Sequence, residues 1–235
     1  MVQWFSKFIT SSIGQKVVMS LTGLFLISFL AVHLLGNLQL LGTDGGQSFN
    51  EYAYFMTHNP VIKTISYGLY AFILIHSIQG LILWRRNKAA RGSVGYAVKV
   101  DRTSGTASFN SVYMASLGTI ILVFILLHMY QFWLQMKLGN TPMTVSGDGE
   151  EIKDLYVLVA AAFENPLYVA LYVISMVVIA FHLWHGFHSA FQTLGLNHQK
   201  YTPFIKAVGK VFSVLVPAGF AIIPIVMYLR HIDVL

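Results

Sequence analysis

Five long apolar segments, separated by short polar stretches, run along this chain. None of them contains Asp, Glu, Lys or Arg, and each is close to the roughly 20 residues that cross a hydrocarbon core about 30 Å thick. The segments are Val17–Leu41, Thr64–Trp84, Val112–Met136, Leu167–Leu194 and Val211–Leu229. Because they are continuously apolar, they lack the alternation of a transmembrane β-barrel. The pattern predicts an all-α integral membrane protein, a bundle of five transmembrane helices.

The composition agrees with this prediction. Of the 235 residues, 56% are hydrophobic and only 10% are charged, whereas soluble domains carry about 25% charged residues. The chain has no cysteine, which excludes disulfides, cysteine-ligated iron–sulfur clusters, thiolate zinc sites and covalently attached haem within it. The sequence shows no internal repeat, so residues 1–235 are expected to form a single membrane domain.

The charges between the segments alternate in sign from one connection to the next. Basic residues precede the first segment and lie between segments two and three and between four and five: Lys7, Lys16, Arg85, Arg86, Lys88, Arg91, Lys99, Arg102, Lys200, Lys206 and Lys210. Cytoplasmic loops are enriched in Lys and Arg, so we expect a cytoplasmic amino terminus and an outer carboxyl terminus. The net charge of +6 is then a topology signal, and no nucleic-acid partner is expected.

Histidines are the candidate functional residues within the first four segments. An ionisable side chain inside a membrane span indicates a functional site. At about 1.5 Å per residue, His33 and His128 lie about 25 Å and 24 Å from the inner face, whereas His76 and His182 lie about 13 Å and 18 Å from it. The four histidines therefore form an outer and an inner pair, each drawn from two helices.

Two imidazoles from two helices can clamp a flat macrocycle inside a bundle, which favours two b haems. Gly80 and Gly186 follow His76 and His182 by one turn and would leave room for a ring. The alternatives are that each histidine is a satisfied polar residue joining two helices or facing water, or that His182 and His185 bind zinc or copper.

Further polar residues lie toward the inner face. His185 and His188 step away from His182 around the helix and are candidate contacts of a haem propionate, a quinone or a partner subunit. Arg85 and Arg86 are candidate partners of inner propionates. For all four, a role as ordinary interfacial or orientation residues stays open.

The ordered motifs resemble the di-haem cytochrome b membrane anchor of succinate dehydrogenase and fumarate reductase, of the kind with a single five-helix polypeptide. The resemblance covers nearly the whole chain. Its motifs are His33-Leu-Leu-Gly-Asn37, Phe49-Asn-Glu-Tyr52 followed by His58, His76-Ser-Ile-Gln-Gly80, Leu127-His-Met-Tyr130, and Phe181-His-Leu-Trp-His-Gly-Phe-His-Ser189 running into Phe191-Gln-Thr-Leu-Gly-Leu-Asn197.

This resemblance implies a function and a ligand set. His33 and His128 would be the axial ligands of the outer haem iron, and His76 and His182 those of the inner one. The chain would anchor an iron–sulfur subunit and a flavoprotein subunit on the cytoplasmic face of a bacterial inner membrane. It would pass electrons between the iron–sulfur subunit and a quinone, commonly menaquinone in this family, and would itself carry no succinate-oxidising site.

The quinone site is expected in one of two places. Near the outer haem, Glu51 is the first candidate for proton transfer to the quinone and His58 the second; Glu51 could equally be an ordinary outer-loop charge. The other candidate place lies at the inner side, near His185 and His188.

Two other functions remain open from the sequence. One is the di-haem cytochrome b subunit of another quinone-linked enzyme, such as a hydrogenase or formate dehydrogenase. The other is a haem-free, proton-coupled transporter that uses its histidines as a proton relay.

Overall fold

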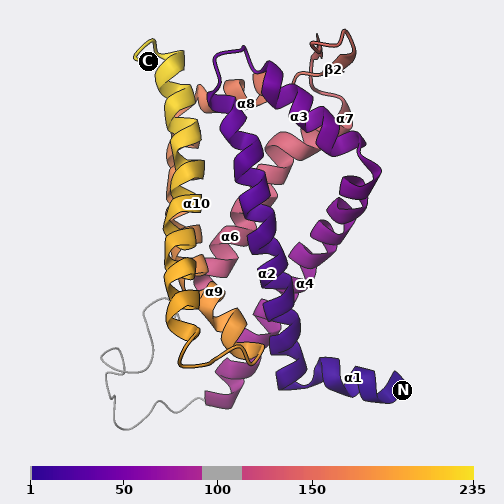
Figure 1. Ribbon diagram of the computed structural model, residues 1–235, viewed down its shortest axis with the longest axis vertical. Helices are drawn as coiled ribbons and strands as arrows, with labels where there is room; N and C mark the ends of the chain where they lie inside the picture. The colour runs from indigo at the N-terminus through magenta and orange to yellow at the C-terminus, as the bar shows by residue number, and fades with distance from the viewer. Residues whose placement is uncertain (1, 92–112) are drawn as a thin grey trace.

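A computed structural model describes residues 2–91 and 113–235, which are mostly helical (Figure 1). Within these residues, five helical stretches are long and apolar enough to cross a membrane. They are α2 (Ser12–Asn37), α4 (Pro60–Arg91), α6 (Met114–His128) with its continuation, α9 (Pro166–Thr193) and α10 (Thr202–His231). The prediction of five apolar spans is confirmed, which is consistent with a multi-pass membrane protein. Residue 112, the first of the predicted third span, lies outside the described residues.

The helices extend beyond the apolar segments that predict them. Helix α10 begins at Thr202, nine residues before the predicted start at Val211, and α4 continues to Arg91. The first charge marks where a span leaves the apolar layer, but it does not stop helical hydrogen bonding. Pro203 fits the first turn of α10, where a missing N–H has no intrahelical partner.

Shorter elements occupy the connections. They are α1 (Val2–Thr10), η1 (Leu38–Leu41), α3 (Gln47–His58), the π-helical turn η3 (Met129–Leu134), α7 (Gln135–Leu138), β1 (Met143–Val145), β2 (Glu151–Lys153) and α8 (Leu155–Phe163). Strands β1 and β2 pair antiparallel, with Met143 opposite Lys153. The all-α prediction therefore missed one small hairpin, because three-residue strands between polar turns leave no clear periodicity in the sequence.

Four of the long helices form a closed ring. Helix α2 contacts α4 and α9, and α6 contacts the same two helices from the other side. Helix α10 lies outside this ring, packed along α9 and touching α2 (Figure 1). Ser213 and Ile223 of α10 are almost completely buried. The four helices of the ring are the ones that carry His33, His76, His128 and His182.

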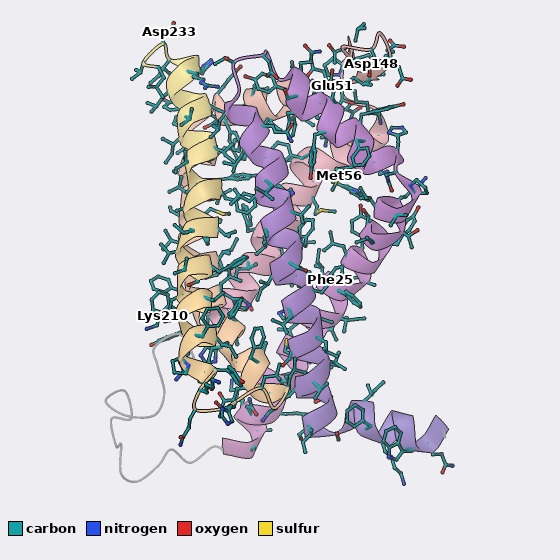
Figure 2. All side chains as sticks on the ribbon, in the orientation of Figure 1. Phe25, Glu51, Met56, Asp148, Lys210 and Asp233 are labelled. Atoms are coloured by element: carbon teal, nitrogen blue, oxygen red, sulfur yellow. The ribbon has the colours of Figure 1, made fainter. Side chains whose placement is uncertain are left out.

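The two ends of the bundle differ in charge. Every acidic residue that the structure describes lies at the end with α3, the hairpin and α8, here called the acidic end. The opposite end, here called the basic end, comprises α1, the last turns of α4 and the α9–α10 connection. Figure 2 shows Glu51, Asp148 and Asp233 at one end and Lys210 toward the other. The two termini also lie at opposite ends (Figure 1).

Helix α3 lies across the acidic end of the ring and is held there from several sides. Tyr52 packs so close to Gly36 of α2 that an added Cβ would lie 2.3 Å from its ring. The Asn50 amide donates to Asp154 (2.9 Å) and accepts from the backbone N–H of Tyr156 (2.9 Å). Because Asn50 is almost fully buried, these bonds fix α3 to the start of α8.

Candidate functional site

The structure brings the four span histidines together as two pairs. The rings of His33 and His128 have centroids 5.9 Å apart and planes at 84°. Those of His76 and His182 are 6.4 Å apart at 70°. Each pair joins opposite helices of the ring, α2 with α6 and α4 with α9. These are the partners that the depth estimate selected.

The spacing of each pair fits two imidazoles on opposite sides of one iron. An imidazole nitrogen lies about 2 Å from a metal ion that it binds, so two opposed rings have centroids about 6 Å apart. Both measured separations lie close to this distance. Histidines that only joined helices would approach to hydrogen-bonding distance, whereas within the described residues no hydrogen bond joins either pair.

Glycines of the neighbouring helices flank the inner pair. A Cβ on Gly23 of α2 would lie 3.2 Å from the His76 ring, and one on Gly118 of α6 would lie 3.7 Å from the His182 ring. Gly186, singled out in the sequence, faces open space, whereas Gly80 lies near the Met19 methyl. Only the tertiary structure identifies Gly23 and Gly118, because each contacts a histidine on another helix.

Thr22 lies within hydrogen-bonding distance of His76, on another helix. Its Oγ1 lies 3.2 Å from Nδ1 of His76 and donates its own proton to the Val18 carbonyl at 2.8 Å. In this arrangement the hydroxyl oxygen is free to accept from Nδ1–H of His76. Nε2 keeps its lone pair, as a metal-binding histidine requires.

Tyr172 has the corresponding place beside His128. Its hydroxyl donates to Oε1 of Gln131 at 2.8 Å, and its oxygen lies 3.5 Å from Nδ1 of His128. Tyr172 is buried, so its ring holds a fixed position between α9 and the π-helical turn. The tyrosine oxygen is thus free to accept from Nδ1–H of His128.

The remaining two histidines have different surroundings. The Asn37 amide nitrogen donates to the His33 carbonyl (2.7 Å) and lies 3.2 Å from Nδ1 of the same residue. Ligation of iron through Nε2 of His33 would require the Asn37 amide to turn its oxygen toward Nδ1. Nδ1 of His182 is a buried atom without a hydrogen-bond partner in the described structure.

A π-helical turn follows His128 directly. Such turns are rare and are often found at functional sites. The turn η3 carries Gln131, the Tyr172 partner, and Trp133, whose Nε1 donates to the Tyr70 hydroxyl on α4 at 2.8 Å. Through these two residues the turn contacts α9 and α4, the two ring neighbours of α6. The sequence held no signal for it, because the segment continues the apolar run of the third span and has the composition of an ordinary helix.

An aromatic layer surrounds the outer pair. Ring contacts within about 6 Å of His33 or His128 come from Phe29, Phe124, Phe132 and Phe220. Such a layer excludes water and lowers the local polarity, conditions that suit a large apolar prosthetic group.

The structure places Glu51 in a structural hydrogen-bond network. Oε1 of Glu51 accepts from the Gly147 N–H (2.8 Å) and from the Gln47 amide (3.0 Å). The Gly147 bond, followed by the Gln47 bond, lowers the pKa of the Glu51 carboxyl below its ordinary value. The carboxylate thereby holds the turn of the β1–β2 hairpin against α3.

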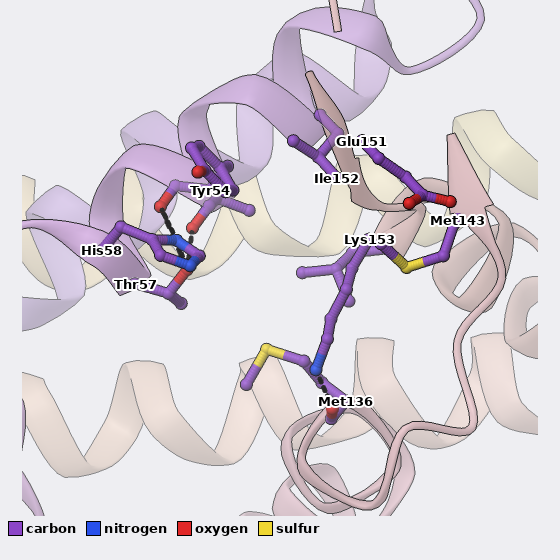
Figure 3. Close-up of a pocket in the computed structure, with 10 residues that line it drawn as sticks. Tyr54, Thr57, His58, Met136, Met143, Glu151, Ile152 and Lys153 are labelled. Atoms are coloured by element: carbon purple, nitrogen blue, oxygen red, sulfur yellow. Dashed lines mark hydrogen bonds between the residues drawn. The ribbon is translucent and has the colours of Figure 1, made fainter. Parts of the chain in front are cut away.

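His58 lines a cavity of about 140 Å³ between α3, Met136 and the hairpin (Figure 3). Its Nδ1 donates to the Tyr54 carbonyl at 2.8 Å, and the ring stacks on Tyr54. Lys153 closes the opposite side of the cavity and donates to the Met136 carbonyl at 2.6 Å. Glu51 does not line this cavity, so the two candidate proton-transfer residues lie in different surroundings.

The two arginines and two histidines predicted near the inner pair have different surroundings. Arg86 donates through Nη1 to Oε1 of Gln15 (2.8 Å) and to the Thr10 carbonyl (3.2 Å). It thus joins α4 to α1 and α2, while Arg85 is exposed. His185 and His188 are half-buried on α9 toward the basic end.

Among the described residues, no group of three or more His, Asp or Glu could hold a metal ion, so a zinc or copper site at His182 and His185 gains no support.

Comparisons with protein-family models, with curated proteins and with solved structures find no match for this chain.

Proposed function

We propose that this chain is the membrane anchor and electron-transfer subunit of a succinate:quinone oxidoreductase, a succinate dehydrogenase or fumarate reductase. The observation that carries the proposal is the pairing of four histidines from four helices, with ring centroids 5.9 Å and 6.4 Å apart. The family assignment rests on the sequence motifs. The complex would lie in a bacterial cytoplasmic membrane, with the basic end of this chain facing the cytoplasm.

Two b haems are the cofactors that these pairs would hold, His33 with His128 and His76 with His182. When bound, they supply one-electron transfer between the two faces, because the two pairs lie at different depths. Ligation by two histidines favours electron transfer over oxygen chemistry, because it leaves the iron no open position. The protein's part is to fix each imidazole. Thr22 and Tyr172 lie beside Nδ1 of His76 and His128 and would accept its proton when Nε2 binds iron.

The soluble partners would dock on the basic end. The chain has no cysteine, so iron–sulfur clusters must come from another subunit, and the flavin from a flavoprotein subunit. Arg85, His185 and His188 lie toward this end with part of their surface accessible. Together with Arg86, which is also exposed, they are the candidate contacts for a partner, a propionate or a quinone. Menaquinone is the quinone that the resemblance favours, with Glu51 and His58 as proton-transfer candidates at the acidic end.

A haem count tests the cofactor part of the proposal. The membrane complex is purified, and a reduced-minus-oxidised spectrum is recorded with a pyridine haemochrome determination of haem b per chain. We expect two haems b per chain. A correctly assembled sample without haem would overturn the proposal and favour the proton-relay transporter.

Single replacements then assign the ligands. His33→Ala or His182→Ala should each reduce the count to one haem, and added imidazole should restore the second, because it can occupy the place of the missing ring. His198→Ala, in the α9–α10 connection, is the matched control and should keep both haems. Circular dichroism and gel filtration show whether each variant is folded. Two haems in both folded ligand variants would exclude the assignment.

The co-purifying subunits test the family part. A flavoprotein together with an iron–sulfur protein would support succinate:quinone oxidoreductase. A nickel or molybdenum subunit would instead identify a hydrogenase or formate dehydrogenase cytochrome b, with the same haem pairs in a different complex.

A further inference from the structure

Helix α1 is amphipathic, although it precedes the first span. At about 100° per residue, Trp4, Phe8 and Ile9 fall on one side of this helix. Gln3, Ser6, Lys7 and Thr10 fall on the other side, and the two groups do not mix. The long helices of the bundle show no comparable separation, since apolar residues are spread around most of their circumference. Helix α1 therefore has the pattern of a helix at a boundary between an apolar and a polar medium.

The apolar side of α1 is uncovered by the described protein. Trp4 is 72% exposed, and Phe8, which stacks on it with centroids 5.9 Å apart, is 36% exposed. A helix of nine residues is only marginally stable alone in water. An apolar medium in contact with Trp4 and Phe8 would supply the missing stabilisation.

Specific contacts fix the direction of α1 at its end. Ser11 donates to the Phe8 carbonyl (2.7 Å) and accepts from the Gly14 N–H (3.0 Å), so it ends α1 and caps α2. Gly14 is required there, because a Cβ would lie 1.9 Å from the Phe8 carbonyl oxygen. The bond from Arg86 to the Thr10 carbonyl fixes the junction to α4. As a result, α1 runs sideways, away from the bundle axis (Figure 1).

The surroundings of α1 indicate what covers its apolar side. Ile13, 72% exposed in the first turn of α2, is a further uncovered apolar residue at the start of the first membrane span. Lys7, Lys16 and Lys88 lie at the same end, which holds no acidic residue among those described. Anionic lipid headgroups attract such a cluster, and tryptophan favours the headgroup level of a bilayer.

We propose that α1 is an interfacial helix that lies in the headgroup region of an anionic bilayer at the basic end. Trp4 and Phe8 enter the acyl boundary, and Ser6 and Lys7 face the headgroups and water. The occupant of the uncovered side is lipid, rather than a second copy of the chain or a soluble protein. This inference does not depend on bound haem.

The absence of cysteine makes a direct test possible. Single replacements Phe8→Cys and Ser6→Cys are spin-labelled in the full chain, reconstituted into vesicles of equal parts phosphatidylcholine and phosphatidylglycerol. Collisions with oxygen report apolar surroundings, and collisions with a water-soluble nickel chelate report water. Leu21→Cys, exposed within the first span, and Glu150→Cys, in the hairpin turn, give the membrane and water references.

We expect the ratio of oxygen to nickel collisions at position 8 to resemble that of the Leu21 reference. The same ratio at position 6 should be at least severalfold lower, close to that of the Glu150 reference. Adding Trp4→Ser to Phe8→Cys should raise nickel collisions at position 8. Water-like collisions at both positions would overturn the proposal. Spin–spin broadening at position 8 that disappears on dilution with unlabelled chain would also overturn it, because it would identify a second copy as the occupant.

Discussion

Thr22 and His76 lie on different helices, 54 residues apart in the chain, with Oγ1 of Thr22 3.2 Å from Nδ1 of His76. Because the hydroxyl proton is already donated to the Val18 carbonyl, the Thr22 oxygen is free to accept a hydrogen bond from Nδ1–H of His76. The contact makes a threonine in an apolar span a specific partner of a candidate iron ligand, and it can be tested without changing any histidine.

Thr22→Val keeps the shape of the side chain and removes the acceptor. It removes one hydrogen-bond acceptor beside Nδ1 of His76, so we expect a loss of about 0.5–1.5 kcal/mol in stability. We also expect an altered reduction potential of the inner haem. Thermal unfolding and redox titration measure the two effects. Thr119→Val is the control, since its hydroxyl donates to the Ala115 carbonyl and contacts no histidine. Equal stability and equal haem reduction potentials in the two variants would show that the Thr22 contact does not influence the inner haem.

Tyr172→Phe removes the hydroxyl between Gln131 and His128. We expect a loss of about 0.5–1.5 kcal/mol for the missing hydrogen bond. If His128 is an iron ligand, the low-temperature electron paramagnetic resonance signal of one haem should shift, because its imidazole is free to rotate. Tyr67→Phe, an exposed position on α4, should leave both stability and signal unchanged. A wild-type signal from a destabilised Tyr172→Phe protein would limit Tyr172 to a packing role.

The hairpin should depend on pH through Glu51. Its folded-state pKa is lowered from the ordinary 4.5, so its stabilising effect is present above that value and is lost as the pH falls through the folded pKa. Hydrogen exchange corrected for intrinsic rates should show Gly147 protected near neutrality and less protected in acid.

Glu51→Gln should remove most of this pH dependence, whereas Glu150→Gln in the same turn should retain it. The same Glu51 variant tests the quinone assignment. If Glu51→Gln keeps both haems and normal quinone turnover, Glu51 is a structural residue of the hairpin, and His58 with its cavity becomes the site to examine at the acidic end.

Gly36 and Gly68 make a matched pair of helix glycines. A Cβ at Gly36 would meet the Tyr52 ring, whereas one at Gly68 would meet nothing within 4 Å. We expect Gly36→Ala to cost about 1–3 kcal/mol by forcing α3 away from α2. Gly68→Ala should be neutral or gain up to about 1 kcal/mol from helix propensity. Chemical denaturation in mixed detergent micelles compares them, and equal effects would show that α3 does not press on α2.

Hydropathy and charge along the chain were sufficient to predict the five spans and the four histidines at two depths. These properties are local: about 20 apolar residues must form a helix in a bilayer, and the rise of a helix places each histidine along it. The apolar pattern could not reveal the β1–β2 hairpin or the π-helical turn, because neither has a hydropathy signal of its own.

The sequence by itself determined which residues enter the membrane and which helices carry imidazoles. Only the tertiary structure decided that Thr22 and Tyr172 face the histidines, that Gly23 and Gly118 flank the inner pair, and that Arg86 fixes α1. The physical reason is that each of these contacts joins segments distant in the chain. Their geometry follows from how the helices pack and rotate against one another, which no local pattern of residues specifies.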